Sequence, residues 1–117
     1  MVDEKFAQEI FQEVVIDFYN IYTELLRTEL EEVTDNSLKN GIKLFSILSE
    51  NHQKVLIQLM IRASIDATST VLGIIDGTTI LSNTWEEFEL IYNNEVINGF
   101  LQDHFLALVE DNENLIQ

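Results

Sequence analysis

Apolar side chains recur at helical spacing over the first part of the chain. Phe6, Ile10 and Val14 begin a stripe that returns every three or four positions, while charged and amide side chains occupy the opposite face. This period predicts an amphipathic helix that buries one side. We expect the helix to span residues 3–32.

Capping and turn residues mark two further helices. Residues 34–37 read Thr-Asp-Asn-Ser, all turn and N-cap formers, so a break should occur there and a helix should follow over residues 38–48. Ser49 can cap a third helix, whose apolar positions keep helical spacing over residues 50–75. Gly77 should end this helix, because glycine adopts the left-handed conformation that closes helices.

The pattern then changes to that of β-strands. Residues 87–90, Glu-Phe-Glu-Leu, alternate between charged and apolar, and the pair Asn93-Asn94 separates two apolar runs. Such a pair predicts a β-hairpin in which both turn residues have positive φ. We expect the β region to cover residues 78–97.

A last amphipathic segment closes the chain. It predicts a helix over residues 100–109, followed by a frayed acidic tail over residues 110–117. Three N-terminal helices, a small antiparallel sheet or hairpin and a closing C-terminal helix predict an α+β fold that is mostly α. The chain of 117 residues is 46% hydrophobic, which is enough for one core, so we expect a single domain over residues 1–117.

Charge is distributed unevenly along the chain. All six Lys and Arg residues and eleven of the 21 Asp and Glu residues lie in residues 1–62, a net charge of -5. Residues 63–117 hold the other ten acids and no Lys or Arg, a net charge of -10. The total of -15 argues against binding nucleic acid or an anionic membrane, since both are polyanions. It favours a basic protein partner, although solubility alone also favours surface acids.

The sequence predicts neither export nor membrane insertion. Residues 1–5 carry two acids where a signal peptide needs net positive charge. The longest apolar stretches, residues 14–16 and 42–48, end well before the ~18 positions that a membrane span requires. The chain contains no cysteine, which fits a reducing compartment. We therefore expect a cytoplasmic protein that does not contact a membrane.

Motifs for cofactors, metals and catalysis are absent from the sequence. No lysine follows the glycine pair Gly73 and Gly77, so a phosphate-binding loop cannot form there. His52 and His104 form no pair at metal-binding spacing, so we expect no metal and no cofactor. We expect no enzymatic activity; the remaining enzyme hypothesis rests on Asp66, the one acid in a segment of apolar and small polar residues.

Acidic and aromatic residues gather at the predicted hairpin. On an extended strand, Glu87 and Glu89 should face one side, and Phe88 and Leu90 the other. Carboxylates attract Arg and Lys, and a large aromatic side chain can anchor an interface. The predicted partner-binding residues are Trp85, Glu86, Glu87, Glu89 and Glu95. The alternative is that the tryptophan belongs to the core and the glutamates only solvate an exposed face.

Size, charge and expected compartment lead to two functional hypotheses. The first is a small protein-binding protein, most concretely an immunity- or antitoxin-like inhibitor of a basic toxin such as a nuclease, because a negative field accelerates capture of a cationic partner. The second is an adaptor that dimerises through its first helix. We expect the apolar stripe of that helix to be too wide for one domain to cover, because five residues extend it: Phe11, Val15, Tyr19, Tyr22 and Leu26.

Overall fold

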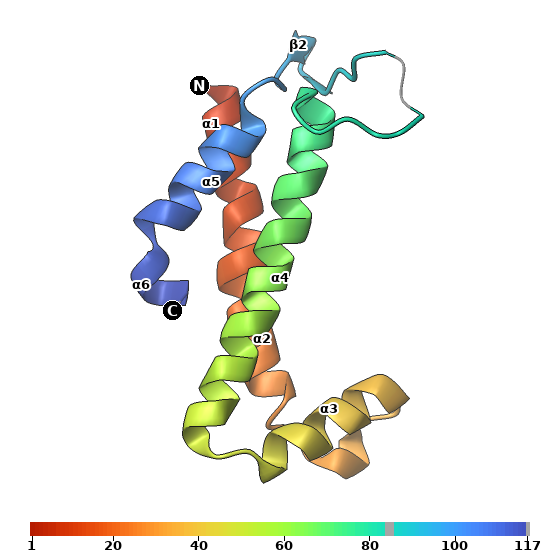
Figure 1. The fold of residues 1–117 in the computed structure, drawn as a ribbon, viewed down its shortest axis with the longest axis vertical. Helices are drawn as coiled ribbons and strands as arrows, with labels where there is room; N and C mark the ends of the chain where they lie inside the picture. Colours follow the sequence, from red (N-terminus) through yellow and green to blue (C-terminus); the bar gives the residue numbers. More distant parts are fainter. Residues whose placement is uncertain (84–85, 117) are drawn as a thin grey trace.

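Helices form most of the molecule, and a two-stranded antiparallel sheet lies at one end (Figure 1). The expected class, α+β and mostly α, is therefore confirmed. The coordinates are a computed structural model that describes residues 1–83 and 86–116, with side chains through residue 114.

One continuous helix begins the chain in three segments. They are α1 (Val2–Phe11), the π-helical turn η1 (Gln12–Asp17) and α2 (Phe18–Leu25). The wider π turn allows Gln12 Nε2 to donate to Asp17 Oδ1, five residues on, over 2.9 Å. At the same turn the Ser64 hydroxyl donates to the Val14 carbonyl over 2.8 Å, which joins this helix to a distant part of the chain.

The predicted helix over residues 3–32 is too long at its C-terminal end. The helix stops at Leu25, residues 26–28 form a turn, and a 3₁₀ turn, η2 (Leu30–Glu32), follows after the extended residue Glu29. Leu26 and Val33 are both buried, and the chain reverses between them to bring both inside. Neither glycine nor proline occurs at this break, so tertiary packing ends the helix where the periodicity alone would continue it.

The next two helices begin at capping residues close to their predicted bounds, and the second also ends at one. They are α3 (Asn36–Ile47) and α4 (Glu50–Asp76). The Asp35 carboxylate accepts from the Leu38 amide over 2.7 Å, and the Ser49 hydroxyl accepts from the His52 amide over 3.2 Å. Gly77 closes α4 in the left-handed conformation, with φ of 86°. These caps are the ones that the sequence predicts.

The C-terminal tail, for which the sequence predicts a frayed segment over residues 110–117, is mostly helical through residue 116. The last helices are α5 (Leu101–Asp111) and α6 (Glu113–Ile116). The Asn112 side chain donates to the Leu108 carbonyl over 2.7 Å at the end of α5, and α6 then contacts α4. This tertiary contact involves a short helix of mixed sequence, Glu-Asn-Leu-Ile.

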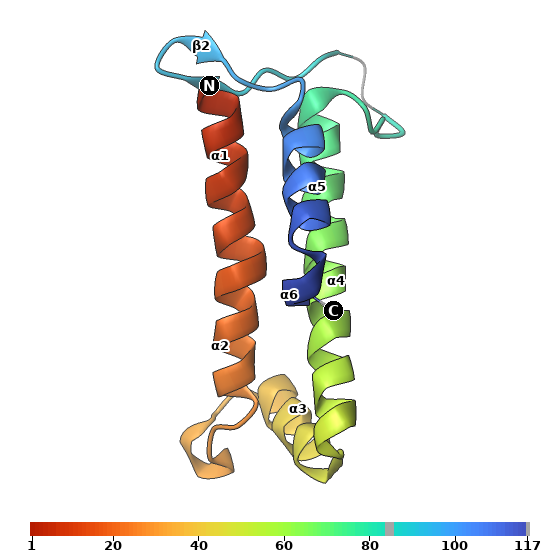
Figure 2. The same ribbon diagram turned by 90° about the vertical axis from the view of Figure 1, so that its left-hand side faces the viewer.

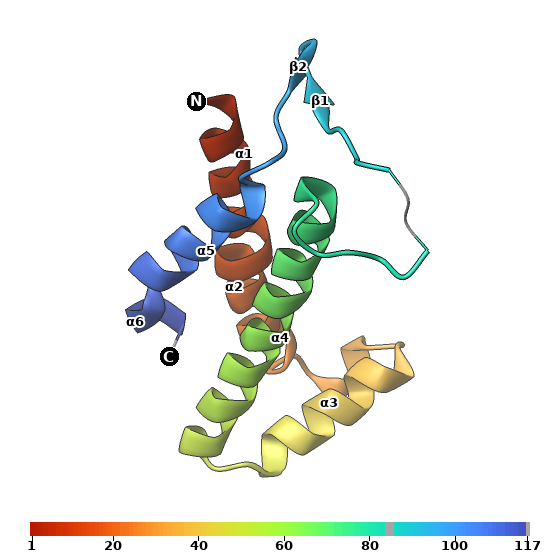
Figure 3. The ribbon, with the colours of Figure 1, turned by 45° about the horizontal axis from the view of Figure 1, so that its top comes forward.

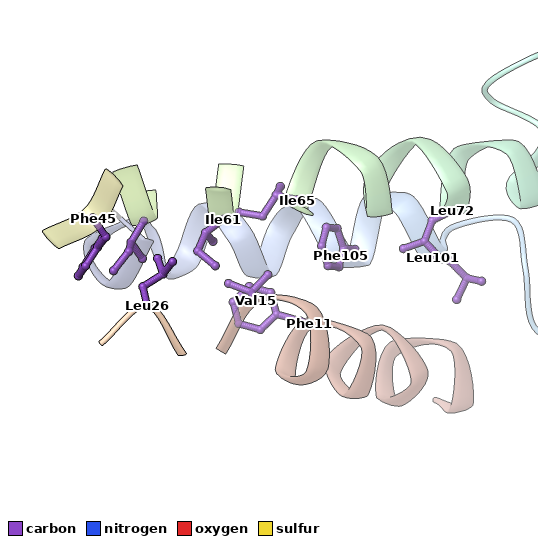
Figure 4. Close-up of a cluster of buried hydrophobic side chains, with 10 residues drawn as sticks. Phe11, Val15, Leu26, Phe45, Ile61, Ile65, Leu72, Leu101 and Phe105 are labelled. Carbon is purple, nitrogen blue, oxygen red and sulfur yellow. The ribbon is translucent and has the colours of Figure 1, made fainter. Parts of the chain in front are cut away.

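The core lies where three helices meet. The first helix and α4 run side by side, α5 packs against both, and α3 crosses the end that lies away from the sheet (Figure 2). Phe11 and Phe105 make an edge-to-face contact at the centre, with ring centroids 6.2 Å apart (Figure 4). Burying an aliphatic or aromatic side chain of this size stabilises the fold by roughly 1.5–3 kcal/mol. This core therefore fixes the positions of all three helices.

Among the described residues, α4 is the one helix that is long and apolar enough to cross a membrane by length and composition alone. Its mean hydropathy reaches 1.4 in an 18-residue window, because its polar residues are mostly uncharged. Ile57, Ile61, Ile65 and Leu72 on this helix are buried against the rest of the chain. The core helix of a soluble protein passes the same test, so the helix is weak evidence for a membrane span.

Candidate protein-binding surface

The hairpin forms where the sequence predicts it. Its strands are β1 (Ile91–Tyr92) and β2 (Glu95–Val96), with Ile91 paired to Val96. Asn93 and Asn94 have φ of 50° and 66°, so both turn residues are in the left-handed region as expected. Asparagine tolerates this conformation better than most residues, because its short side chain can bond locally.

The strands are much shorter than the predicted β region over residues 78–97. The Leu90 carbonyl accepts from the Ile97 amide over 2.8 Å, but the Leu90 amide donates to the Asn98 side chain over 2.7 Å. A side chain therefore takes the place of a strand partner at this position. Residues 86–90 accordingly lie outside the ladder, and the strict alternation of their side chains does not apply.

Asn98 joins the base of the hairpin to the end of α4. Its Oδ1 accepts from the Leu90 amide, and its amide nitrogen donates to the Ile75 carbonyl over 2.7 Å and to the Phe88 carbonyl over 2.9 Å. One side chain thus satisfies three backbone groups, one at the end of α4 and two in the segment before the hairpin. Such a connection holds the approach to the hairpin in one conformation.

The Asp76 carboxylate makes a second connection from the end of α4. It accepts from the Gly99 amide over 2.6 Å and from the Gln102 amide over 2.7 Å. These amides belong to the start of α5, whose N-cap residue Phe100 has no side-chain acceptor. Asp76 therefore caps α5 from a distance, as an N-cap aspartate would do locally.

The Gln102 side chain completes this group of polar contacts. Its amide nitrogen donates to the Ser69 carbonyl over 3.0 Å, and its oxygen accepts from the Thr78 hydroxyl over 2.7 Å. We call the four side chains of Asp76, Thr78, Asn98 and Gln102 the polar junction. None of these contacts is predicted from the sequence; Asp76 and Asn98, each followed by a glycine at a turn, are the local signal that points to them.

Four of the five predicted partner-binding residues lie on the surface of this end of the molecule. Glu86, Glu87, Glu89 and Glu95 are all exposed, whereas Trp85 lies outside the described residues. Phe88 and Leu90 do not share one environment as an extended strand would require. Phe88 is 44% exposed, and Leu90 is half-buried and packs against the core.

Apolar side chains are exposed beside these glutamates. Figure 3 shows the hairpin extending beyond the ends of the helices. Ile91, Tyr92 and Val96 are 59%, 57% and 55% exposed, respectively. We call residues 86–96 the hairpin end. A cluster of exposed apolar side chains with acidic neighbours is typical of a protein–protein contact.

A cavity of about 350 Å³ lies between α1 and the hairpin end. Its walls are mostly apolar, and Lys5 and Glu9 contribute charged groups: the lining residues are Val2, Lys5, Phe6, Glu9, Tyr92 and Ile97. Residues 63–117 contain no Lys or Arg, but Lys5 of α1 lines this cavity. The region therefore includes one basic side chain.

A side-chain contact joins α5 to the first turn of α1, which contributes Val2 and Lys5 to this cavity. His104 Nε2 lies 3.1 Å from Asp3 Oδ2, and both side chains are half-buried. The hydrogen bond from His104 lowers the pKa of the Asp3 carboxyl below its ordinary value of 3.8. The contact holds the first turn of α1, and with it Val2 and Lys5, beside the start of the hairpin.

Asp66 occupies an open helix face. Its side chain is 66% exposed and lies 3.4 Å from the guanidinium of Arg62, one turn earlier on α4. Asp66 and Arg62 both line an open groove between α4 and α5. Within the part of the chain that the structure describes, no three His, Cys, Asp or Glu side chains lie together in a group that could hold a metal ion.

The candidate protein-binding surface therefore consists of the hairpin end, the polar junction beneath it and the adjoining cavity. Its chemistry combines carboxylates, aromatic and aliphatic groups on a fixed base. A comparison with protein-family models, curated proteins and solved structures finds no match to this chain.

Proposed function

We propose that this chain is a small acidic protein-binding protein whose hairpin end engages a basic protein. Its most concrete form is an immunity- or antitoxin-like inhibitor that covers a cationic toxin, such as a nuclease. One observation carries the proposal: Glu86, Glu87, Glu89 and Glu95 are exposed beside exposed apolar side chains at one end of a strongly acidic molecule.

The charge supports fast capture of such a partner. A net charge of -15 creates a long-range field that attracts a cationic protein and orients it before contact. Exposed glutamates at the rim of an interface mainly raise the association rate, whereas buried anchors slow dissociation. An inhibitor of a lethal enzyme benefits from such speed.

The apolar groups and the cavity supply anchors for the complex. Tyr92 is exposed at the hairpin and also lines the cavity beside Phe6. The space of about 350 Å³ suits an apolar side chain of the partner, because its walls are mostly apolar and its two charged groups, Lys5 and Glu9, have opposite signs. Anchors of this kind carry most of the binding free energy in protein interfaces.

The polar junction supports the proposal through preorganisation. Asp76 and Asn98 hold the hairpin to the ends of α4 and α5 before any partner arrives. A surface that is already ordered loses less conformational entropy on binding. Less of the free energy gained from contacts at the hairpin end is then offset by lost conformational entropy, so the affinity is higher.

The test begins with a pull-down from the native cell, followed by association kinetics with the captured protein. Glu87→Gln/Glu89→Gln should lower the association rate roughly tenfold at low salt and flatten its salt dependence. Glu13→Gln/Glu24→Gln removes the same charge from exposed positions on the first helix and should change the rate less than about twofold. A captured partner that is itself acidic, or equal effects of the two double variants, would contradict the proposal.

The adaptor hypothesis receives less support from the first helix than its sequence suggests. Of the five residues that widen its apolar stripe, Phe11, Val15 and Leu26 are buried within the chain, and Tyr22 is half-buried. Tyr19 is 39% exposed. Dimerisation through this helix would use Tyr19 together with Phe18 and Ile21, which are 38% and 51% exposed.

A further inference from the structure

A second surface, away from the hairpin end, leaves apolar side chains open to solvent. It is a groove of about 530 Å³ between α4 and α5, and we call it the α4–α5 groove. Val55 and Leu59 of α4 are 53% and 64% exposed, and Leu106 of α5 is 40% exposed; all three line it. Leucine and valine side chains exposed to this extent in one groove form an apolar patch with no covering element.

The groove is open because α5 and α6 are short. Figures 1 and 2 show that they accompany only the half of α4 nearer the hairpin. The other half of α4, which includes Val55 and Leu59, contacts α2 on one side. The position that a longer third helix would occupy in a complete bundle is therefore vacant along part of α4.

The molecule exposes more surface than a compact domain of its length, by more than an interface of standard size removes from one partner. Its radius of gyration is 17.2 Å, against roughly 13 Å for a compact domain of this length. Its accessible surface is 8375 Å², about 1,900 Å² more than the ~6,500 Å² typical of a folded monomer of 13.5 kDa. A stable interface removes about 800 Å² from each partner, so this excess is sufficient for one.

The charges in the groove favour a second copy of the same chain as its occupant. Its charged lining residues are Arg62, Asp66 and Glu113, of which Arg62 and Asp66 pair within one copy. In a two-fold contact each surface meets itself, so the Arg62 of one copy can face the Asp66 of the other. A groove with both signs is self-complementary in a way that the hairpin end, without Lys or Arg between residues 86 and 96, is not.

We propose that two copies of this chain associate with two-fold symmetry through their α4–α5 grooves, with Leu59 as the apolar anchor and Arg62 facing the partner copy's acid. The groove extends along α4 away from the hairpin end, so the dimer leaves both hairpin ends free for basic partners. The inference is independent of the proposed function, since it uses a different surface.

Sedimentation equilibrium over a range of concentrations tests the dimer directly. The purified chain should approach twice its monomer mass of 13.5 kDa as concentration rises. Leu59→Gln should weaken dimerisation about tenfold, because it places an amide in the apolar contact. Val71→Gln is the matched control: Val71 is 54% exposed on the same helix but lies outside the groove, so its change should be less than about twofold. Circular dichroism checks that both variants stay folded.

Charge reversal tests the pairing of Arg62 with Asp66 across the dimer. Arg62→Glu should weaken association, and Arg62→Glu/Asp66→Arg should restore it, because the exchanged pair is equivalent by symmetry. A single 13.5 kDa species at every concentration, or a dimer that Leu59→Gln leaves intact, overturns the proposal.

Salt separates this proposal from the proposed function. Two copies that each carry a net charge of -15 repel one another, so dimerisation should strengthen as salt rises. Capture of a basic partner should weaken over the same range. The salt dependence of dimerisation and that of partner capture are measured in separate experiments. One proposal can therefore be contradicted while the other is supported.

Discussion

Gly73 lies where two side chains leave no room for a β carbon. A Cβ built there would be 2.6 Å from Thr79 Oγ1 and 2.7 Å from Gln102 Nε2. Gln102 is held by hydrogen bonds to Ser69 and Thr78, so it cannot move away without losing them. Gly41 provides a contrast on another helix, because a Cβ there meets only Leu26 Cδ2 at 3.5 Å, an ordinary contact.

The two glycines should therefore respond to alanine with opposite signs. Gly41→Ala should raise the free energy of unfolding by up to about 1 kcal/mol, the usual gain for alanine in a helix. Gly73→Ala should lower it by about 1–2 kcal/mol, because the lost hydrogen bonds of the polar junction outweigh that gain. Urea denaturation followed by circular dichroism measures both. Equal stabilisation by the two variants would show that Gln102 and Thr79 move aside freely.

Residues whose partners are near in sequence could be assigned from the sequence, and those with distant partners could not. Asp35 and Ser49 bond to amides three residues on, so their capping roles follow from local spacing. The partners of Asp76 lie 23 and 26 residues away, and no periodic pattern identifies them. The exposed glutamates of the candidate site were predicted from composition and alternation. The contacts of the polar junction, which fix the base of the hairpin, could be identified only from the structure.

At the scale of elements, the contact between Asp3 and His104 joins the first turn of α1 to α5. The folded-state pKa of Asp3 is lowered from its ordinary value of 3.8, chiefly by the hydrogen bond with His104. Folding therefore favours the ionised carboxyl. The resulting stabilisation is fully present above about pH 3.8 and is lost as the pH falls through the lowered folded value.

Replacing this carboxyl should produce a stability difference that depends on pH. Asp3→Asn should be less stable than the natural sequence at pH values well above 3.8, and the difference should shrink on acidification through the region below that value. Urea midpoints measured across this range give the result. Glu4→Gln controls for the loss of an acid near the helix dipole, and His104→Gln should remove most of the difference made by Asp3→Asn. A difference that persists unchanged in strong acid would exclude the carboxylate as its source.

Elements with a capping or turn signal were predicted closely, and those that end by packing were not. Gly77 closes α4, and the pair Asn93-Asn94 turns the hairpin, as their conformational preferences require. The first helix ends before its predicted bound because the Leu26 side chain is buried in the core. The tail is helical where α6 contacts α4. Both outcomes depend on contacts between segments far apart in the chain, which local propensity does not contain.

For the molecule as a whole, the two proposed surfaces differ in the sign and balance of their charge. The hairpin end carries four exposed glutamates among apolar groups, whereas the α4–α5 groove contains Arg62 and Asp66 together. Only the first requires a partner of opposite charge. A cluster of carboxylates held close together also repels itself in the free protein, so the surface that accelerates binding should lower the stability of the fold.

This conflict between stability and binding gives the last prediction. Glu86→Gln, Glu87→Gln, Glu89→Gln and Glu95→Gln, combined in one variant, should raise the urea midpoint at ~0.01 M salt, where the Debye length is about 30 Å. The molecule measures 48 × 32 × 26 Å, so its net charge of -15 is poorly screened under that condition.

At ~0.1 M salt the Debye length falls to about 10 Å, so the gain should shrink. A matched variant with Glu9, Glu13, Glu24 and Glu31 changed to glutamine removes the same charge from the first helix and the turn after it. Its gain should be smaller, because those acids are spread along the chain instead of lying within residues 86–95. An equal rise of the urea midpoint in both variants would mean that stability depends only on the total charge. Repulsion among the glutamates of the hairpin end would then not lower the stability of the fold.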